Sequence, residues 1–479
     1  MLFNSLTYAI FLPIVFILYW KIFKNNRNGQ NILLLIASYV FYGWWDYRFL
    51  SLIFISSCVD FLVGVFLGKT EKLSKRKLLL SLSIITNLGL LGFFKYFNFF
   101  TDSFADLLTS LGLQANYSSL NIILPVGISF YTFQTLSYTL DVYKKELLPT
   151  RDFVSFFAFV SFFPQLVAGP IERASNLLPQ FYKKRNFDLE KAKGGLRQIL
   201  WGLFKKIVIA DTCATQVEYI FSNYNNLSGI TLIVGVIYFA FQIYGDFSGY
   251  SDIAIGSARL FGFDLMRNFA YPYFSRNIAE FWRRWHISLS TWFRDYVYIP
   301  LGGNRGNKFN QIKNSIITFT ISGFWHGANW TFVIWGFLNG LYYIPGILFG
   351  NIKKKKEKNK DIVALNRIFP SFREISAIII TFILTLIAWV FFRAQSVSQA
   401  FYYIRQIAVL SFDKSESGLY SYLYLILILV IIEWINRRHE HPLYFKSAPA
   451  PIRWIVYYAV LMVIFLYFKD AKSFIYFQF

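Results

Sequence analysis

Apolar segments long enough to cross a lipid bilayer recur from one end of the sequence to the other. The hydrocarbon core of a bilayer is about 30 Å thick, so a spanning helix needs roughly 20 apolar residues. Transmembrane β-strands are shorter, about 10 residues, and alternate apolar with polar side chains. The runs here are too long and too uniformly apolar for strands, and we predict an all-α, polytopic integral membrane protein. The clearest runs are Leu6–Trp20, Ile32–Trp45, Phe49–Leu67, Leu78–Phe94, Thr231–Tyr244, Ile375–Phe392, Leu419–Ile435 and Ile452–Phe468.

The net charge of +22 is concentrated in short basic clusters between the apolar runs. A basic chain can bind nucleic acid, but this placement is the one that the positive-inside rule produces in cytoplasmic loops. We therefore expect a lipid bilayer and no nucleic acid as the partner, with both termini extracytoplasmic. Hydropathy predicts about ten to twelve crossings and a first helix rather than a signal peptide. The clusters include Lys21–Arg27, Lys69–Lys77, Lys183–Lys193, Lys353–Lys360 and Arg437–Arg453.

Simple hydropathy fails between Leu124 and Gly303, where Pro, Gly and charged residues interrupt the apolar patches. Irregular or charged backbone at membrane depth is tolerated only when it is buried in protein or lines a cavity. We therefore predict half-helices and re-entrant segments around a cavity. The patches that we do not read as clean spans are Leu124–Gln134, Phe162–Arg173, Tyr244–Asp252 and Glu280–Tyr296. The whole chain, 1–479, is expected to form one domain. Its parts would be N-terminal helices (1–123), a core (124–350), C-terminal helices (351–468) and a tail (469–479).

The segment Tyr273–Tyr296 has the periodicity of one amphipathic helix. Arg276, Glu280 and Arg284 follow each other at four-residue steps and predict a ladder of ion pairs. Two interpretations are open: a helix lying on the membrane surface, or a helix that caps a cavity toward which His286 and the arginines face. Arginine would suit the phosphate groups of an activated acyl donor. The apolar stripe comprises Phe281, Trp285, Leu289, Trp292 and Tyr296.

A second histidine, His326, lies in a stretch of 37 residues, Asn314–Gly350, without an acidic or basic side chain. That stretch is too long for one crossing, and the glycines of Gly323–Gly327 predict a break near the bilayer midplane. A buried neutral imidazole can take a proton from an attacking hydroxyl, and the glycines would let a substrate approach. The alternative is a structural histidine that hydrogen-bonds between helices.

Metal chemistry has little support in the sequence. The four histidines are His286, His326, His439 and His441, and no pair has the spacing of a zinc-binding helix. We predict no metal site and no bound cofactor.

Several blocks of sequence, which include both candidate histidines, resemble the membrane-bound O-acyltransferases (MBOAT). The similarity is to their bacterial branch, which is typified by alginate O-acetyltransferases and is related to peptidoglycan O-acetyltransferases and teichoic-acid D-alanyl transferases. It covers essentially the whole chain. The blocks are LPVGISFYTFQ (Leu124–Gln134), FPQLVAGPIER (Phe163–Arg173), DFSGYSDIAIG (Asp246–Gly256), EFWRRWHISLSTWFRDYVYIPLGG (Glu280–Gly303) and GFWHGANWTFVIWG (Gly323–Gly336).

The resemblance implies a ring of helices around a thin basin, with a central tunnel that joins the two faces of a bacterial cytoplasmic membrane. It implies that His326 is the catalytic histidine and that His286 is the second histidine of the site. We expect the following residues to line the tunnel or bind substrate: Trp285, Arg284, Trp325, Asn329 and Asp246.

The chain ends in Phe474–Phe479, whose FxYxxF pattern is similar to the C-terminal motif of the small partner peptide in the D-alanylation system. That resemblance implies that Tyr476 relays the acyl group. A phenol with a pKa near 10 needs a base before it can attack. The alternative is an aromatic belt at the membrane interface, and both interpretations stay open here.

The function that these expectations describe is O-acyl transfer, most simply O-acetylation of an extracytoplasmic polysaccharide with His326 as the base. Acetyl-CoA or another acyl thioester would be the donor, with an acyl carrier protein as a further candidate source. By analogy with the family, a periplasmic SGNH-type acetyltransferase or esterase would be the partner. The alternatives are a transporter or flippase of a cell-envelope precursor and a scaffold of a polymer-export complex.

Overall fold

The computed structural model describes residues 1–113, 120, 122–167, 169–350, 362–445, 448–469 and 474–475. Within these ranges all regular secondary structure is helical, which confirms the all-α prediction. The basic stretch Lys353–Lys360 lies outside the described residues. Two compact units are formed: unit 1 comprises Met1–Lys193 and Ser257–Leu265, and unit 2 comprises Gly194–Gly256 and Met266–Phe479.

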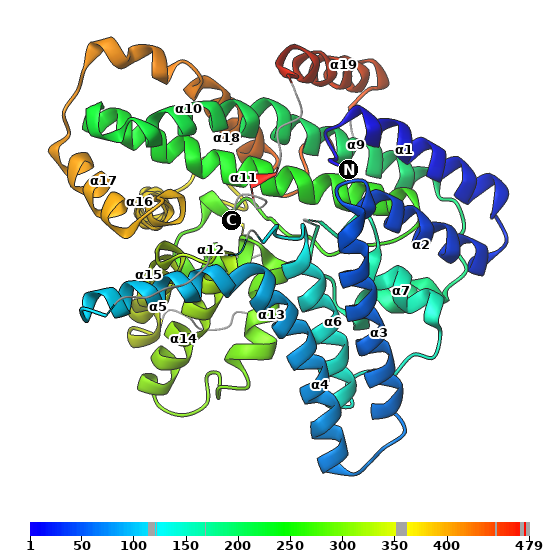
Figure 1. Ribbon diagram of the computed structural model, residues 1–479. Helices are drawn as coiled ribbons and strands as arrows, with labels where there is room; N and C mark the ends of the chain where they lie inside the picture. The colour runs from blue at the N-terminus through cyan, green and yellow to red at the C-terminus, as the bar shows by residue number, and fades with distance from the viewer. Residues whose placement is uncertain are drawn as a thin grey trace. The chain divides into compact units, whose positions relative to one another are not determined.

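Most of the α-helices are labelled in Figure 1. Unit 1 contains α1 (Leu6–Ile17), α2 (Arg27–Gly43), α3 (Leu50–Leu67), α4 (Leu73–Leu91), α5 (Phe97–Ser110), α6 (Ile128–Tyr143), α7 (Phe153–Ser161) and α8 (Ala174–Tyr182). Most of α9 (Leu189–Leu203) and α11 (Gly229–Leu260) belongs to unit 2. Unit 2 also contains α10 (Asp211–Ser222), α12 (Ile278–Arg284), α13 (Ile287–Phe293), α14 (Lys308–His326), α15 (Trp330–Leu348), α16 (Phe372–Arg393), α17 (Val397–Val409), α18 (Leu423–Ile435) and α19 (Ala450–Tyr467).

Six of the described helical segments are long and apolar enough to cross a membrane, or up to seven if the bent pair Lys414–Tyr420 and Leu423–Ile435 forms one span. Every apolar run identified in the sequence lies mainly within a helix. Length and composition therefore give fewer spans than the ten to twelve crossings predicted from hydropathy. Helices such as α7 and α8, with 9 residues each, are too short to cross a bilayer at about 1.5 Å per residue.

In unit 1, a buried carboxylate holds three helices together. Asp60 on α3 accepts hydrogen bonds from Ser83 and from Asn87 (2.7 Å) on α4, and from Thr139 (2.8 Å) on α6. Asp60 and these partners are buried, and Figure 1 shows α3, α4 and α6 side by side. A polar group in an apolar surrounding is costly unless it is paired, so this cluster fixes how the three helices pack.

The sequence prediction was wrong for α11, which runs unbroken for 32 residues through the Asp246–Gly256 block and is a candidate span. The glycines that suggested a break are contacts with α9. A Cβ on Gly202 would lie 2.6 Å from the Gly249 carbonyl oxygen, and one on Gly256 would lie 2.5 Å from the Gly195 carbonyl oxygen. Small residues let helix backbones approach closely, so α9 and α11 pack in antiparallel directions along this face.

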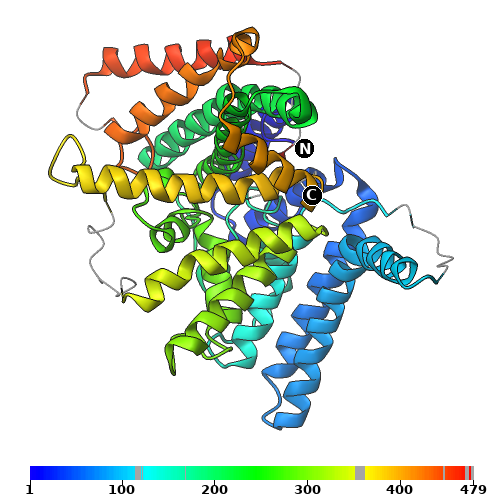
Figure 2. The ribbon, with the colours of Figure 1, turned by 90° about the vertical axis from the view of Figure 1, so that its left-hand side faces the viewer.

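The predicted break at Gly323–Gly327 is confirmed, because α14 ends at His326 and α15 begins at Trp330. The two helices, yellow-green in Figure 2, form an antiparallel pair. A Cβ on Gly323 would lie 2.2 Å from the Phe332 carbonyl oxygen, and one on Gly336 would lie 2.3 Å from the Phe319 carbonyl oxygen. The glycines beside His326 therefore permit helix packing, whereas the sequence had suggested an approach of substrate to the backbone.

Substitution of two glycines on α9 tests the close packing of α9 against α11. We expect Gly202→Ala to destabilise the protein by about 1–3 kcal/mol because its methyl group has no room. Gly194→Ala is the matched control, since a Cβ there meets nothing within 4 Å; it should stabilise the helix by about 0.5–1 kcal/mol. Thermal unfolding of both purified variants in detergent measures the difference. An equal or higher melting temperature for Gly202→Ala would contradict the packing.

Candidate active site

The segment Tyr273–Tyr296 is broken at His286, although its periodicity predicted one helix. α12 ends before this residue and α13 begins after it, and the His286 backbone is left-handed with φ 41° and ψ 56°. Residues 268–270 make two backbone hydrogen bonds, each 2.9 Å long, to the residues on either side of the break. Periodicity reflects side-chain spacing only, so it could not reveal that another segment satisfies these backbone groups.

His286 is buried and held by polar contacts on one edge of its ring. Its Nδ1 lies 3.2 Å from Asn268 Oδ1 and 3.4 Å from Ser288 Oγ. The ring of Phe247 on α11 packs edge-on against it, with centroids 4.4 Å apart. Burial lowers the pKa of His286 to about 3, so the imidazole is neutral at physiological pH. A neutral imidazole can act as a base.

His326 ends α14 inside an aromatic environment. Its ring centroid lies 4.9 Å from Trp325, 5.0 Å from Trp335 and 5.4 Å from Phe392, and only 3% of the residue is exposed. Trp330, four residues after His326, is 56% exposed. Tryptophan side chains from α15 and from beside His326 thus shield this imidazole from bulk solvent.

A continuous series of rings connects the two histidines within unit 2. Beginning from His326, successive centroids are 5.0 Å to Trp335, 5.8 Å to Trp389, 5.1 Å to Trp285, 5.1 Å to Phe269 and 6.2 Å to His286. Trp285 and Trp325, both expected at the site, belong to this aromatic cluster. The cluster brings together residues from α14, α15, α16 and the segments around α12, which lie far apart in the sequence.

The predicted ladder of ion pairs is confirmed, and two of its three members are buried. Glu280 forms ion pairs with Arg276, at 3.0 Å, and with Arg284. Arg284 Nη1 also donates to the Tyr271 carbonyl oxygen at 3.4 Å. Glu280 and Arg284 are both buried, so α12 is not a surface helix with a solvated charged face. The Arg284 guanidinium is already bound to a carboxylate of the protein.

Asp246 lies where the C-terminal tail enters unit 2. Its carboxylate pairs with Lys206 at 2.7 Å and accepts the backbone N–H of Ile475 at 2.7 Å. Lys206 also pairs with Asp211 at 2.9 Å. These residues line a pocket of ≈ 350 Å³, together with Arg393 and others. Its size is within the usual range for small-molecule sites, roughly 300–1,000 Å³.

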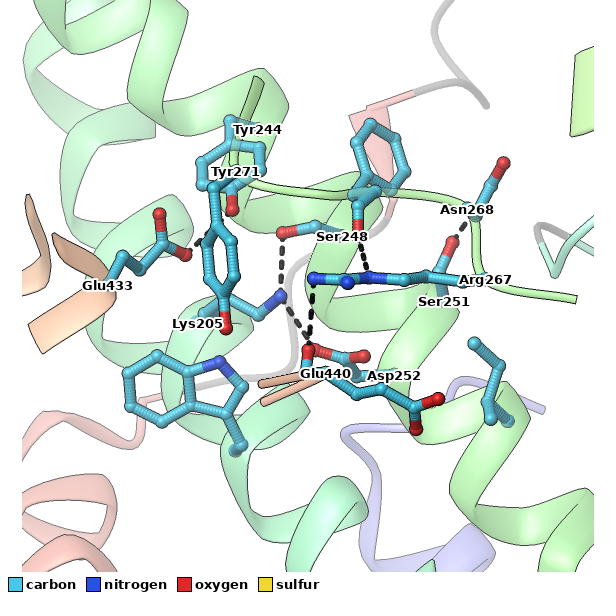
Figure 3. A pocket seen from close by; sticks show the side chains of 13 residues that line it. Lys205, Tyr244, Ser248, Ser251, Asp252, Arg267, Asn268, Tyr271, Glu433 and Glu440 are labelled. Atoms are coloured by element: carbon cyan, nitrogen blue, oxygen red, sulfur yellow. Dashed lines mark hydrogen bonds and ion pairs between the residues drawn. The ribbon is translucent and has the colours of Figure 1, made fainter. Parts of the chain in front are cut away.

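A smaller polar pocket in unit 2 is shown in Figure 3. Lys205 pairs with Asp252 at 2.7 Å and donates to Ser248 at 2.8 Å, while the Tyr244 hydroxyl donates to Glu433 at 2.7 Å. Its free volume of ≈ 10 Å³ is enough for about one water molecule. Asn268 also lines this pocket, so the residue that contacts His286 belongs to a larger polar network.

Two of the predicted site residues, Asn329 and Tyr476, are not seen at the site. Asn329 caps α15: its Oδ1 accepts from the Thr331 N–H at 3.0 Å, and its Nδ2 donates to the Gln395 carbonyl at 3.0 Å. Tyr476 lies outside the described residues, although its neighbours Phe474 and Ile475 are described and buried. In the part of the chain with described coordinates, no three His, Cys, Asp or Glu side chains are arranged to hold a metal ion.

Sequence reasoning missed Asn268 and the two lysines, Lys205 and Lys206. The lysines had a recognisable signal, because they stand alone in the apolar run Trp201–Ala210. Ionisable residues in such runs are functional or paired by default. Asn268 had none, since an asparagine in a polar connecting segment is ordinary.

Similarity to known proteins shows the family of the chain. Residues 45–397 match the membrane-bound O-acyltransferase family (MBOAT). The chain is 40% identical over 404 residues to the probable alginate O-acetylase AlgI of Pseudomonas aeruginosa, covering 84% of this chain and 73% of that protein. It is 37% identical to the peptidoglycan O-acetyltransferase of Helicobacter pylori, covering 84% and 78%. It is 30% identical to the teichoic acid D-alanyltransferase of Bacillus subtilis, covering 56% and 68%. The chain is a multi-pass membrane enzyme, an O-acyltransferase that belongs to the MBOAT family.

Proposed function

We propose that this O-acyltransferase moves an acetyl group from a cytoplasmic thioester to a hydroxyl of an extracytoplasmic polysaccharide. The observation that carries the proposal is the pair of buried imidazoles, His286 and His326, joined by one aromatic cluster in unit 2. The names of two relatives refer to alginate and to peptidoglycan, both polymers with hydroxyl groups. Acetyl-CoA is the simplest donor, and an acylated carrier protein would present the same thioester.

In the proposed reaction, His326 removes a proton from the attacking hydroxyl. The hydroxyl oxygen forms a bond to the carbonyl carbon of the thioester, and the carbon–sulfur bond breaks. The thiolate that leaves receives the proton from the imidazolium, which restores the neutral base. The aromatic walls exclude water, which would otherwise compete with the hydroxyl as acceptor. His286 lies at the other end of the aromatic cluster, where it would position or polarise the reacting groups.

The C-terminal tail supplies a candidate acyl carrier. Phe474 packs against Phe247 with centroids 5.5 Å apart, and Phe247 itself contacts His286. Ile475 is fixed by Asp246. These contacts hold the two residues before Tyr476 inside unit 2, which supports the relay over an aromatic belt in lipid. We propose that the Tyr476 hydroxyl accepts the acetyl group and passes it on.

The distribution of basic clusters supports an orientation with both termini extracytoplasmic in a bacterial inner membrane. In that orientation the donor binds on the cytoplasmic side and the tail lies on the outer side. A periplasmic SGNH-type transferase or esterase is the proposed partner that completes transfer to the polymer.

Replacement of His326 tests its role as the base. We expect His326→Gln to reduce acetyl transfer from labelled acetyl-CoA by roughly 10²- to 10⁴-fold, the usual contribution of a general base. His439→Gln is the matched control, because that histidine is exposed and should retain full activity. Transfer by purified protein in detergent provides the measurement. Full activity of His326→Gln would refute the role, and transport without transfer would favour a flippase.

Removal of the Tyr476 hydroxyl distinguishes the two interpretations of the tail, an acyl relay and an aromatic belt. Tyr476→Phe keeps the ring but deletes the hydroxyl, so the relay predicts loss of polymer acetylation and of any labelled acyl-protein. Phe477→Tyr is the control, since it adds a phenol one residue away without removing Tyr476. Mass spectrometry of the C-terminal peptide detects the acyl group. Unchanged polymer acetylation by Tyr476→Phe would leave only the belt.

The hydrogen bond between Asp246 and the tail can be tested separately. Asp246→Ala removes a charge-assisted hydrogen bond, and we expect the Ile475 amide to exchange with deuterium roughly 10- to 100-fold faster. Asp246→Asn is the control, because it keeps an oxygen acceptor for the same N–H. Hydrogen–deuterium exchange of the C-terminal peptide gives the rates. Equal exchange in Asp246→Ala and in the unmodified protein would show that Asp246 does not hold the tail.

A further inference from the structure

The Asn268 side chain makes contacts that fix the orientation of its amide. Its Oδ1 lies 3.2 Å from the backbone nitrogen of Ser288 and 2.9 Å from the Ser288 hydroxyl, and its Nδ2 lies 3.1 Å from Ser251 Oγ. A backbone N–H can only donate, so the amide atom that faces it must be the oxygen. The Ser251 hydroxyl can accept from the amide nitrogen on the other side. The amide therefore has one orientation, set by the backbone.

This orientation determines which nitrogen of His286 carries the proton. Nδ1 lies 3.2 Å from the same Asn268 oxygen, and an amide oxygen has no hydrogen to donate. The Ser288 hydroxyl, the other polar group at Nδ1, has one hydrogen and donates it to Asn268 Oδ1 at 2.9 Å, a closer contact than its 3.4 Å to Nδ1. Nδ1 is therefore the donor, and in a neutral ring Nε2 then holds the lone pair. The ring is neutral because burial lowers its pKa to about 3. The favoured state of His286 is the Nδ1–H tautomer, the less common form of a free histidine side chain in water.

Nε2 of His286 is a buried acceptor that the described part of the protein leaves without a hydrogen-bond partner. Its neighbours are apolar rings, with Phe247 at 4.4 Å and Phe269 at 6.2 Å between centroids. An unsatisfied buried acceptor costs about 1–3 kcal/mol, so its presence calls for an explanation. The left-handed backbone of His286 is a second local cost at the same residue.

We propose that Asn268 is a positioning residue that holds His286 as the Nδ1–H tautomer, so that His286 Nε2 can accept the proton of an acyl-accepting hydroxyl. This inference rests on the proposed function. In the step, the hydroxyl oxygen bonds to the acyl carbon while its proton moves to Nε2. The bond from that carbon to its leaving group then breaks, and the leaving group takes the proton from His286.

A second base is useful if the acyl group moves in two transfers. A relay through the tail acylates two hydroxyls in turn, first on the tail and then on the acceptor, and each hydroxyl must lose a proton. His286 and His326 lie at opposite ends of one aromatic cluster, and Asn268 Oδ1 lies against Nδ1 of His286. The pair therefore provides one base for each transfer.

The tautomer can be observed directly in protein labelled with ¹⁵N-histidine. The sequence has four histidines, so the His286 signals are those that disappear in His286→Gln. At neutral pH we expect a protonated Nδ1 and an unprotonated Nε2. A wild-type protein with its proton on Nε2 would overturn the inference, whatever the activity measurements show.

Variants of Asn268 test the functional part of the proposal. The leucine of Asn268→Leu cannot accept a hydrogen bond from Nδ1–H of His286, so we expect the proton to shift to Nε2. We expect kcat to fall roughly 10²- to 10⁴-fold, with KM for acetyl-CoA unchanged. Asn268→Asp keeps an oxygen that can accept from His286 Nδ1 and from Ser288, and it should retain the tautomer and more activity than Asn268→Leu. Ser251→Ala, which removes only the contact on the amide nitrogen side, is the matched control.

The outcomes distinguish this inference from the proposed function. An unchanged tautomer or an unchanged kcat in folded Asn268→Leu overturns the positioning role, while wild-type activity still supports O-acetyl transfer. Full activity of His286→Gln overturns proton acceptance by Nε2. If the wild-type protein transfers no acetyl group, the proposed function fails, and the NMR spectrum still decides the tautomer.

Discussion

The structure of unit 2 depends on the pairing of buried charges between α11 and the chain that follows α9. Lys205 pairs with Asp252, and Lys206 pairs with Asp246, each at 2.7 Å. An unpaired charge in such surroundings costs several kcal/mol, and removal of one partner of a buried pair costs about 3–5 kcal/mol. The pairs form only because glycines let the helix backbones approach. Close packing and charge pairing thus require each other.

This pairing also positions the candidate active site, because α11 carries the residues that meet the other parts. Asp246 contacts the tail, Phe247 contacts both the tail and His286, and Ser251 contacts Asn268. Six residues of one helix, fewer than two turns, therefore reach the tail, a histidine and the residue that orients it. A shift of α11 along α9 would disturb all of these contacts together, so the rigid helix pair serves as the reference for the site.

The sequence revealed which segments are apolar and buried, but it did not reveal which residues contact each other. The apolar runs predicted helices because burial in lipid selects for length and hydrophobicity. The resemblance and the lone imidazole pointed to His326. Yet the break at His286 depends on backbone bonds from residues 268–270, and the glycines of α11 allow close packing against α9 without breaking the helix. A glycine in a sequence is ambiguous, because the same residue permits either a turn or a close contact between helices.

The two histidines lie in different surroundings. The His326 ring lies among indole and phenyl rings, which exclude water. His286 has an amide oxygen at Nδ1, which selects the Nδ1–H tautomer. A base with an assigned lone pair loses less entropy at the moment of proton transfer, because its orientation is already fixed. The left-handed backbone of His286, with φ 41°, is strained because it interrupts the helix. The backbone hydrogen bonds from residues 268–270 offset this strain. Local distortion, buried polar contacts and an unsatisfied acceptor converge on His286, which is the combination expected where a fold gives up stability for chemistry.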